Sequence, residues 1–186
     1  NRFFGNVYTS YQTDFGTTNH KLNAKYMVGV DAYTTHYVDS YGYGSNTGGG
    51  RGQIENYGWT NATYNSLLTI NYDWHINEDW GLNAVVGNEI IQSNRKKYYE
   101  YGTNYNFPGW NHINNATTQQ TEEETWKNRT VGFFGNVSAS YRNMLYLTLT
   151  GRQDYVSNMP RKNRSFFYPS ISAGFILTEL DALKNN

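Results

Sequence analysis

The stretch Val131–Phe175, VGFFGNVSASYRNMLYLTLTGRQDYVSNMPRKNRSFFYPSISAGF, decides the fold of this chain. Within it, the run Leu145–Asp154 separates its side chains by parity, a period of two that is typical of a β-strand with one apolar and one polar face. A similar run meets it at the short turn Tyr141–Tyr146, and a third ends in Tyr168–Phe175. The apolar face carries Leu145, Leu147 and Leu149, and the polar face carries Tyr146, Thr148, Thr150, Arg152 and Asp154.

The composition favours an all-β protein. The chain has 186 residues, enough for one domain, and its 18 Tyr and 18 Gly with only 3 Pro favour strands and turns over helices. A formal net charge of zero implies no broad electrostatic attraction to nucleic acid, so we expect no nucleic-acid partner. The absence of Cys excludes a disulfide framework and a thiolate metal site.

No run of 18 apolar residues is present, which excludes a transmembrane helix. A transmembrane barrel strand needs only about 9–11 residues of alternating character, so the alternating runs remain compatible with a membrane. The chain begins inside a strand pattern and ends at Asn185-Asn186 without a closing element. We therefore expect it to be a piece of a longer protein.

The alternation predicts about seven long strands in an antiparallel meander. Connections after the first, third and fifth strands are short, whereas those after the second and fourth are long, about Val38–Thr60 and Glu100–Thr125. Outer-membrane barrels show this pattern of short periplasmic turns and long outer loops, so we predict an arc of a large transmembrane β-barrel. The first five strands are predicted at Phe3–Gln12, Lys21–Tyr37, Asn61–Ile76, Trp80–Tyr99 and Trp126–Arg142, and a helical turn is possible at Thr178–Asn186.

A barrel gives each face of the sheet a role. The apolar face would contact lipid through Leu145, Leu147, Leu149, Ile171, Ala173 and Phe175. The polar face would line the lumen with Asp73, Glu89, Arg142, Arg152 and Asp154. Amphipathic rings prefer the membrane interface, so the aromatic residues beside the short turns predict a periplasmic girdle of Tyr72, Trp74, Trp80 and Tyr141.

No catalytic, cofactor or metal site is predicted. The Gly-rich run Gly42–Thr47 lacks the third glycine of a dinucleotide fingerprint. Asp73 and Glu89 lie several residues apart along their hairpin, which argues against a glycosidase pair. The histidines have neither metal-ligand spacing nor Cys partners: His20, His36, His75 and His112. We expect a protein that is not an enzyme.

The segment Val131–Leu180 resembles the late barrel region of the SusC/RagA family of TonB-dependent outer-membrane transporters. The matching features are Gly132-Phe133-Phe134-Gly135, Tyr141-Arg142-Asn143, Arg152 with Asp154, Asn163-Arg164 and Phe167–Phe175. The chain departs from the family where Arg152–Ser157 reads RQDYVS in place of RRDGSS, and where Ile176 replaces a basic residue after an aromatic one. These departures concern the loop and the lumen rather than the fold.

The resemblance implies a barrel of about 22 strands, occluded by an N-terminal plug and energised by the TonB complex in the bacterial outer membrane. It also implies a SusD-like surface lipoprotein as a lid, and glycans or peptides as imported substrates. Residues 1–186 would form about a third of the barrel, with the plug, the TonB box and the barrel closure outside them. Aromatic residues in or beside the predicted long loops are candidate contacts for substrate or lid: Trp59, Tyr98, Tyr99, Tyr101, Tyr105 and Trp110.

Two alternatives remain at this level. One is a soluble, aromatic-rich β-sandwich that binds carbohydrate, in which Leu145, Leu147 and Leu149 would be buried against a second sheet. The other is a different outer-membrane barrel, such as a porin or an adhesin. Exposed leucines would favour a barrel, and buried leucines would favour the sandwich.

Overall fold

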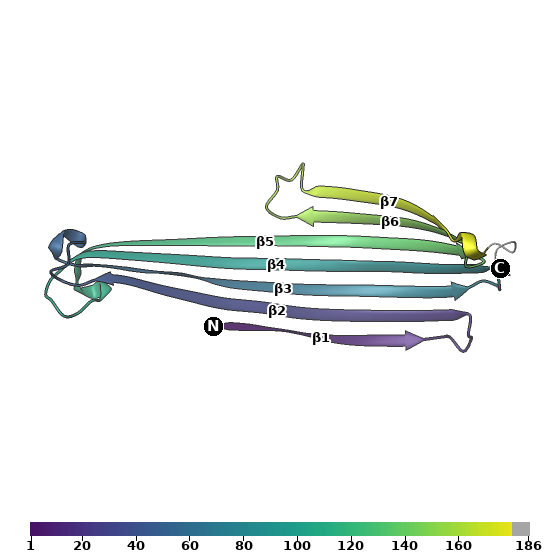
Figure 1. Ribbon diagram of the computed structural model, residues 1–186, viewed down its shortest axis with the longest axis horizontal. Helices are drawn as coiled ribbons and strands as arrows, with labels where there is room; N and C mark the ends of the chain where they lie inside the picture. Colours follow the sequence, from purple (N-terminus) through teal and green to yellow (C-terminus); the bar gives the residue numbers. More distant parts are fainter. Residues whose placement is uncertain (180–186) are drawn as a thin grey trace. The chain divides into compact units, whose positions relative to one another are not determined.

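The computed structural model describes residues 1–179, which form one seven-stranded sheet (Figure 1). Neighbouring strands in the sheet follow one another in the sequence, so the topology is a meander. The predicted all-β meander is therefore confirmed. The strands are β1 Arg2–Thr13, β2 His20–Tyr41, β3 Gln53–His75, β4 Trp80–Tyr105, β5 Ala116–Tyr141, β6 Leu145–Val156 and β7 Ser165–Phe175.

Helical structure in the described residues is confined to short 3₁₀ turns at Gly48–Gly50, Ile113–Asn115 and Leu177–Glu179. Within this part of the chain, no helix is long and apolar enough to cross a membrane. The helical turn predicted at Thr178–Asn186 falls largely on residues 180–186, which lie outside the described residues.

The predicted long loops are wrong in extent, because the strands continue into them. Strand β3 begins at Gln53 rather than Asn61, and β5 begins at Ala116 rather than Trp126. Strand β4 continues to Tyr105, six residues beyond its predicted end at Tyr99. The added part of β5 is polar on both faces, and the added parts of β3 and β4 mix polar, glycine and aromatic residues. These ends therefore lack the continuous apolar face on which the prediction depended. Backbone pairing needs no apolar face, and cross-strand side-chain pairs add to its stability.

The β5–β6 hairpin confirms the predicted turn and the predicted parity. In the register, Tyr141 pairs with Leu145, and Val137 pairs with Leu149. Arg142 and Asn143 take left-handed φ values of 50° and 52°, and the Met144 N–H donates to the Tyr141 carbonyl at 2.9 Å. Asn tolerates this conformation better than most residues.

The β6–β7 register continues the apolar face. Phe175 lies opposite Leu145, Ala173 opposite Leu147, and Ile171 opposite Leu149. The three leucines are 44–50% exposed, and the described residues contain no second sheet that could cover them. The β-sandwich alternative requires such a sheet, so the fold argues against it.

The chain divides into two compact units, which are named unit 1 and unit 2 below. Unit 1 contains Asn1–Phe4, Val30–Thr63 and Ser93–Lys127, and the described part of unit 2 contains Gly5–Gly29, Tyr64–Gln92 and residues 128–179. The buried hydrophobic residues belong to unit 1 and are Ile54, Tyr105 and Ala116, against which Ile113 packs. The Tyr105 hydroxyl donates to the Gln53 carbonyl at 2.8 Å, so this small core also satisfies its polar atom.

Candidate functional site

The polar face of unit 2 carries side chains that bond to one another across strands. Asn136 Nδ2 donates to Thr150 Oγ1 at 3.0 Å, and the hydroxyls of Ser138 and Thr148 are hydrogen-bonded at 2.9 Å. Both pairs are directly opposite in the β5–β6 register. The even positions of these two strands therefore form a continuous hydrophilic surface, which suits a face in contact with water.

The same chemistry recurs between β3 and β4. Asn83 Nδ2 donates to Asp73 Oδ1 at 2.6 Å and to Asn71 Oδ1 at 2.8 Å. Asn71 in turn donates to Asp73 Oδ2 at 2.8 Å. A shallow depression lies beside this group and is also lined by Ser138 and Ser140 of β5. Asp73 is thus held by two amide side chains, one from its own strand and one from β4.

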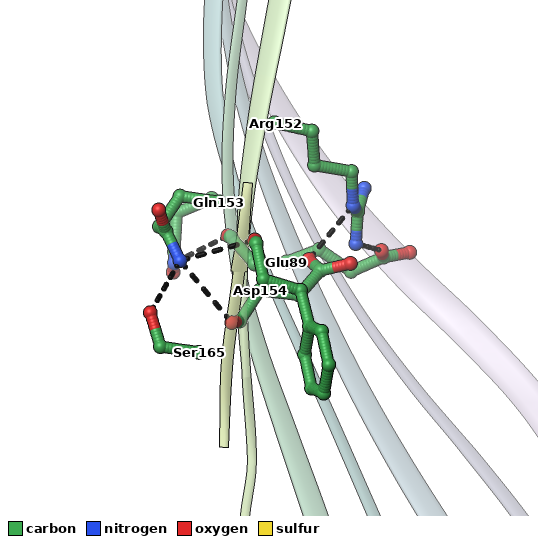
Figure 2. A network of polar contacts seen from close by, with 8 residues as sticks. Glu89, Arg152, Gln153, Asp154 and Ser165 are labelled. Carbon is green, nitrogen blue, oxygen red and sulfur yellow. Dashed lines mark hydrogen bonds and ion pairs between the residues drawn. The ribbon is translucent and has the colours of Figure 1, made fainter. Parts of the chain in front are cut away.

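Arg152 is the centre of an ionic network on this face, shown in Figure 2. Its Nη2 lies 2.7 Å from Glu89 Oε2, and its Nε lies 2.8 Å from Asp154 Oδ1. Glu89 belongs to β4 and Arg152 to β6, so the guanidinium crosses the whole width of β5. The structure brings together three of the five predicted polar-face residues, each between 18% and 33% exposed.

Gly132 leaves the space that the guanidinium occupies in this crossing. It pairs with Asp154 in the β5–β6 register and lies beneath the guanidinium. A Cβ at position 132 would fall 2.5 Å from Arg152 Nη2 and 2.6 Å from Asp154 Oδ1, closer than real Cβ contacts. Sequence reasoning noted this glycine only as part of a motif and missed its role, which depends on side chains from two other strands.

Gln153 lies on the other face of β6, as its parity requires. Its Nε2 donates to Ser165 Oγ at 2.8 Å and to the Phe166 carbonyl at 3.0 Å (Figure 2). These bonds tie the end of β6 to the start of β7. The fifth predicted polar-face residue, Arg142, lies in the β5–β6 turn, where its Nε bonds Asp79 Oδ1 at 2.9 Å.

The aromatic residues predicted as a girdle form two groups. Trp80 and Tyr141 have ring centroids 4.7 Å apart. His20 stacks on Trp74 at 5.6 Å, and its Nδ1 is hydrogen-bonded to the Tyr72 hydroxyl at 2.7 Å. All of these residues lie close to the short turns that end β1, β3 and β5.

The candidate loop contacts are placed mostly on strands. Trp59 lies on β3, and the four tyrosines lie on β4. Tyr105 is fully buried, so it is a core residue rather than a surface contact. Trp110 alone lies in the loop between β4 and β5, where it stacks against Phe107 and His112.

One buried side chain helps to hold that loop. Asn115 is fully buried, and its Nδ2 donates to the carbonyls of Phe107 and Trp110, both at 2.8 Å. In the region the structure describes, no group of three or more His, Asp or Glu side chains could hold a metal ion.

Comparisons of structure define the class of fold. No family model matches the chain. A solved structure of the RagAB peptide transporter superposes over 100% of this chain with a TM-score of 0.84 at 17% identity, and the match covers 21% of that chain. The RagAB peptide importer in its open-open state gives a TM-score of 0.68 over 94% of this chain, at 17% identity and 20% coverage of that chain. The fold is that of a segment of this transporter's barrel.

Comparisons of sequence then identify the relatives. The chain is 28% identical over 137 residues to the TonB-dependent receptor P26 of Formosa agariphila, covering 69% of this chain and 13% of that protein. It is 26% identical over 192 aligned residues to the TonB-dependent receptor SusC of Bacteroides thetaiotaomicron, covering 100% of this chain and 18% of that protein. These findings confirm the resemblance to SusC/RagA-type TonB-dependent transporters. The chain spans between about an eighth and a fifth of each relative's length.

Proposed function

We propose that residues 1–186 are part of the barrel of a TonB-dependent transporter in the bacterial outer membrane. The observation that carries the proposal is the superposition of the whole chain on the RagAB peptide transporter with a TM-score of 0.84. Similarity to two TonB-dependent receptors supports the same class and favours it over a porin or an adhesin.

The chemistry of unit 2 supports a membrane role. One face of its β5–β7 sheet presents Leu147, Leu149 and Ile171 without cover, and the opposite face is lined by hydroxyls, amides and ion pairs. A sheet in a bilayer must satisfy its backbone internally and present apolar side chains to lipid, which this arrangement allows once the barrel is closed. We assign the leucine-bearing face to lipid and the face of Arg152 to the lumen.

The length of the central strands supports the proposal that their outer ends project from the membrane. Strands β3, β4 and β5 have 23, 26 and 26 residues, whereas about 9–11 residues suffice to cross the bilayer. With the girdle aromatics beside the short turns at the periplasmic side, the excess length falls in unit 1. We propose that unit 1 lies outside the hydrocarbon, where a core of its own is needed.

For the complete protein, we propose TonB-driven import of an oligosaccharide or a peptide without catalysis. A SusD-like surface lipoprotein would act as the lid. The support is the similarity to the TonB-dependent receptor SusC and to the RagAB peptide transporter. Trp59, Tyr98, Tyr99, Tyr101 and Trp110 remain proposed contacts for substrate or lid.

Cell fractionation of the native, full-length protein tests the proposal. We expect recovery in the outer-membrane fraction, release only by detergent, and loss of uptake of labelled oligosaccharides and peptides when the TonB gene is deleted. Recovery as a soluble monomer without detergent would contradict the membrane assignment. Uptake that persists without TonB would contradict the energised mechanism while leaving the barrel intact.

A further inference from the structure

Unit 1 carries a row of five side chains, named here the aromatic strip: Tyr37, Tyr57, Trp59, Arg95 and Trp126. Tyr37 stacks on Tyr57 at 5.2 Å with an interplanar angle of 15°, and contacts Trp59 at 5.8 Å. The Arg95 guanidinium carbon lies 5.4 Å from the Trp59 ring and 5.6 Å from the Trp126 ring. The strip therefore runs without interruption across β2, β3, β4 and β5.

The strip is a surface rather than a core. Tyr37 and Trp126 are both 47% exposed, and Arg95 is also exposed. The buried cluster of unit 1 is made by other residues, centred on Ile54 and Tyr105. Large aromatic side chains that are held in contact with each other and left open to solvent are characteristic of binding sites.

Arg95 differs from other arginines of the chain in how it is held. Arg2 bonds Asp31, and Arg129 Nε donates to Gln92 Oε1 at 2.9 Å. Within residues 1–179, the guanidinium of Arg95 donates no hydrogen bond and is positioned by the faces of two indoles. The side chain is exposed, so its N–H donors are available to an acceptor while the two rings hold the guanidinium in place.

The spacing of the strip suits an extended ligand that lies across the strands. The groups in contact along the strip have centres 5.2–5.8 Å apart. This distance is close to the roughly 4.8 Å between neighbouring strands, because successive members come mostly from successive strands. The backbone N–H and C=O groups of these inner strands are already paired within the sheet. A peptide therefore finds no strand edge to extend here.

A saccharide chain matches this surface. The C–H faces of its rings can stack on tyrosine and tryptophan, and its hydroxyl and ring oxygens can accept hydrogen bonds from Arg95. We propose that the aromatic strip is a binding site for an extended oligosaccharide, which narrows the substrate class of the transporter proposed above and rests on that proposal. Sequence reasoning reached only Trp59, because the other members come together through the sheet.

The test is binding of the full-length, detergent-purified protein to an array of neutral and acidic oligosaccharides, with a random decapeptide library as the comparison. We expect glycan binding that is weakened about three- to tenfold by Trp126→Ala, from the usual strength of aromatic contacts. Arg95→Gln should also weaken binding, and Trp126→Phe should retain part of it. Tyr43→Ala removes a tyrosine of unit 1 that is 45% exposed and off the strip, so it should bind as the wild type does.

Three results would overturn the inference: no binding to any arrayed glycan, equal glycan affinity for the wild type and Trp126→Ala, or a loss confined to peptide binding. Each variant is first checked for native size by gel filtration and for the mobility of unheated samples on gels. If the aromatic strip does not bind glycans but the protein still requires detergent for extraction from the membrane, only the further inference is wrong and the transporter proposal stands. A soluble, non-membrane protein removes both.

Discussion

Strands β1 to β5 each contribute residues to both unit 1 and unit 2, but the two units are stabilised in different ways. Unit 1 buries Ile54, Tyr105 and Ala116 and satisfies the hydroxyl of Tyr105 within the same cluster. Unit 2 contributes none of the buried hydrophobic residues found in the described chain, and leaves Leu147 and its neighbours exposed. Continuous backbone pairing therefore coexists with two kinds of side-chain environment. Unit 1 has a small buried core, whereas unit 2 leaves an apolar face exposed, as the proposed contact with lipid requires.

The difference implies different surroundings for the two units. An apolar face of this kind is a liability in water, because exposed apolar patches favour association. In lipid the same face is neutral or favourable, and the hydrophilic face must then meet water or protein. The following substitutions in the full-length protein test whether each unit responds as its environment predicts.

The largest effect is expected at the apolar face of unit 2. Leu147→Arg should destabilise the barrel by about 2–4 kcal/mol, the cost of a basic side chain at the lipid-facing midplane. Thr148→Arg is the control, since it places the same side chain one residue along β6 on the other face. Urea unfolding in lipid vesicles, followed by gel mobility, measures both. Equal costs at the two positions would contradict the assignment of the faces.

The next effect is expected in the loop held by unit 1. Asn115→Ala removes two donors to the carbonyls of Phe107 and Trp110, and leaving such groups unpaired costs about 1–3 kcal/mol. We expect faster proteolysis within residues 106–112. Asn114→Ala changes the adjacent, exposed asparagine and should leave the cleavage rate unchanged. Similar rates for both variants would show that the two Asn115 side-chain bonds do not hold the loop.

A smaller effect is expected at the ionic network of unit 2. Arg152→Gln should cost about 1 kcal/mol, because the pair is partly exposed and screened, and because Glu89 and Asp154 lose their shared cation. Glu89→Gln should cost less, since Asp154 still neutralises the guanidinium. Urea unfolding at low and high salt measures the difference, which should shrink as salt rises. An identical cost for both variants would argue against a shared cation.

The smallest effect is expected at the turns. The side chains of Arg142 and Asp79 are 53% and 45% exposed, so Arg142→Ala should change stability by no more than about 0.5 kcal/mol. The same urea titration checks this value. A cost above that of Arg152→Gln would mean that the two turns act as a structural unit.

The sequence is most informative where the two faces of a strand differ. Leu145–Leu149 alternate strictly, and the registers of both hairpins keep this parity, so the strands, the turn at Arg142-Asn143 and the meander were predictable. The same reasoning fails in unit 1, where tyrosine, tryptophan and charged residues occupy both faces. There the sequence predicts loops where the structure has strand ends, because no periodic signal separates the two.

Sites built from several strands could not be predicted from the sequence. Tyr37 and Trp126 belong to one row, although they lie far apart in the chain, and only the register of three strand pairs aligns them. The pairing of Arg152 with Glu89 has the same origin. The alternation places Arg152 and Glu89 on one face. Their contact across β5 also depends on the lack of a side chain at Gly132, which the alternation does not reveal.

That absent side chain at Gly132 has a mechanical consequence. Because Arg152 spans from β6 to β4 over the gap, one guanidinium senses the alignment of two strand interfaces at once. A slip of one residue at either interface would turn the carboxylate to the opposite face, and a slip of two would carry it about 6–7 Å away. Gly132 thus leaves space for one side chain, Arg152, to link β6 to β4 across β5 and so to oppose sliding of the three strands past one another.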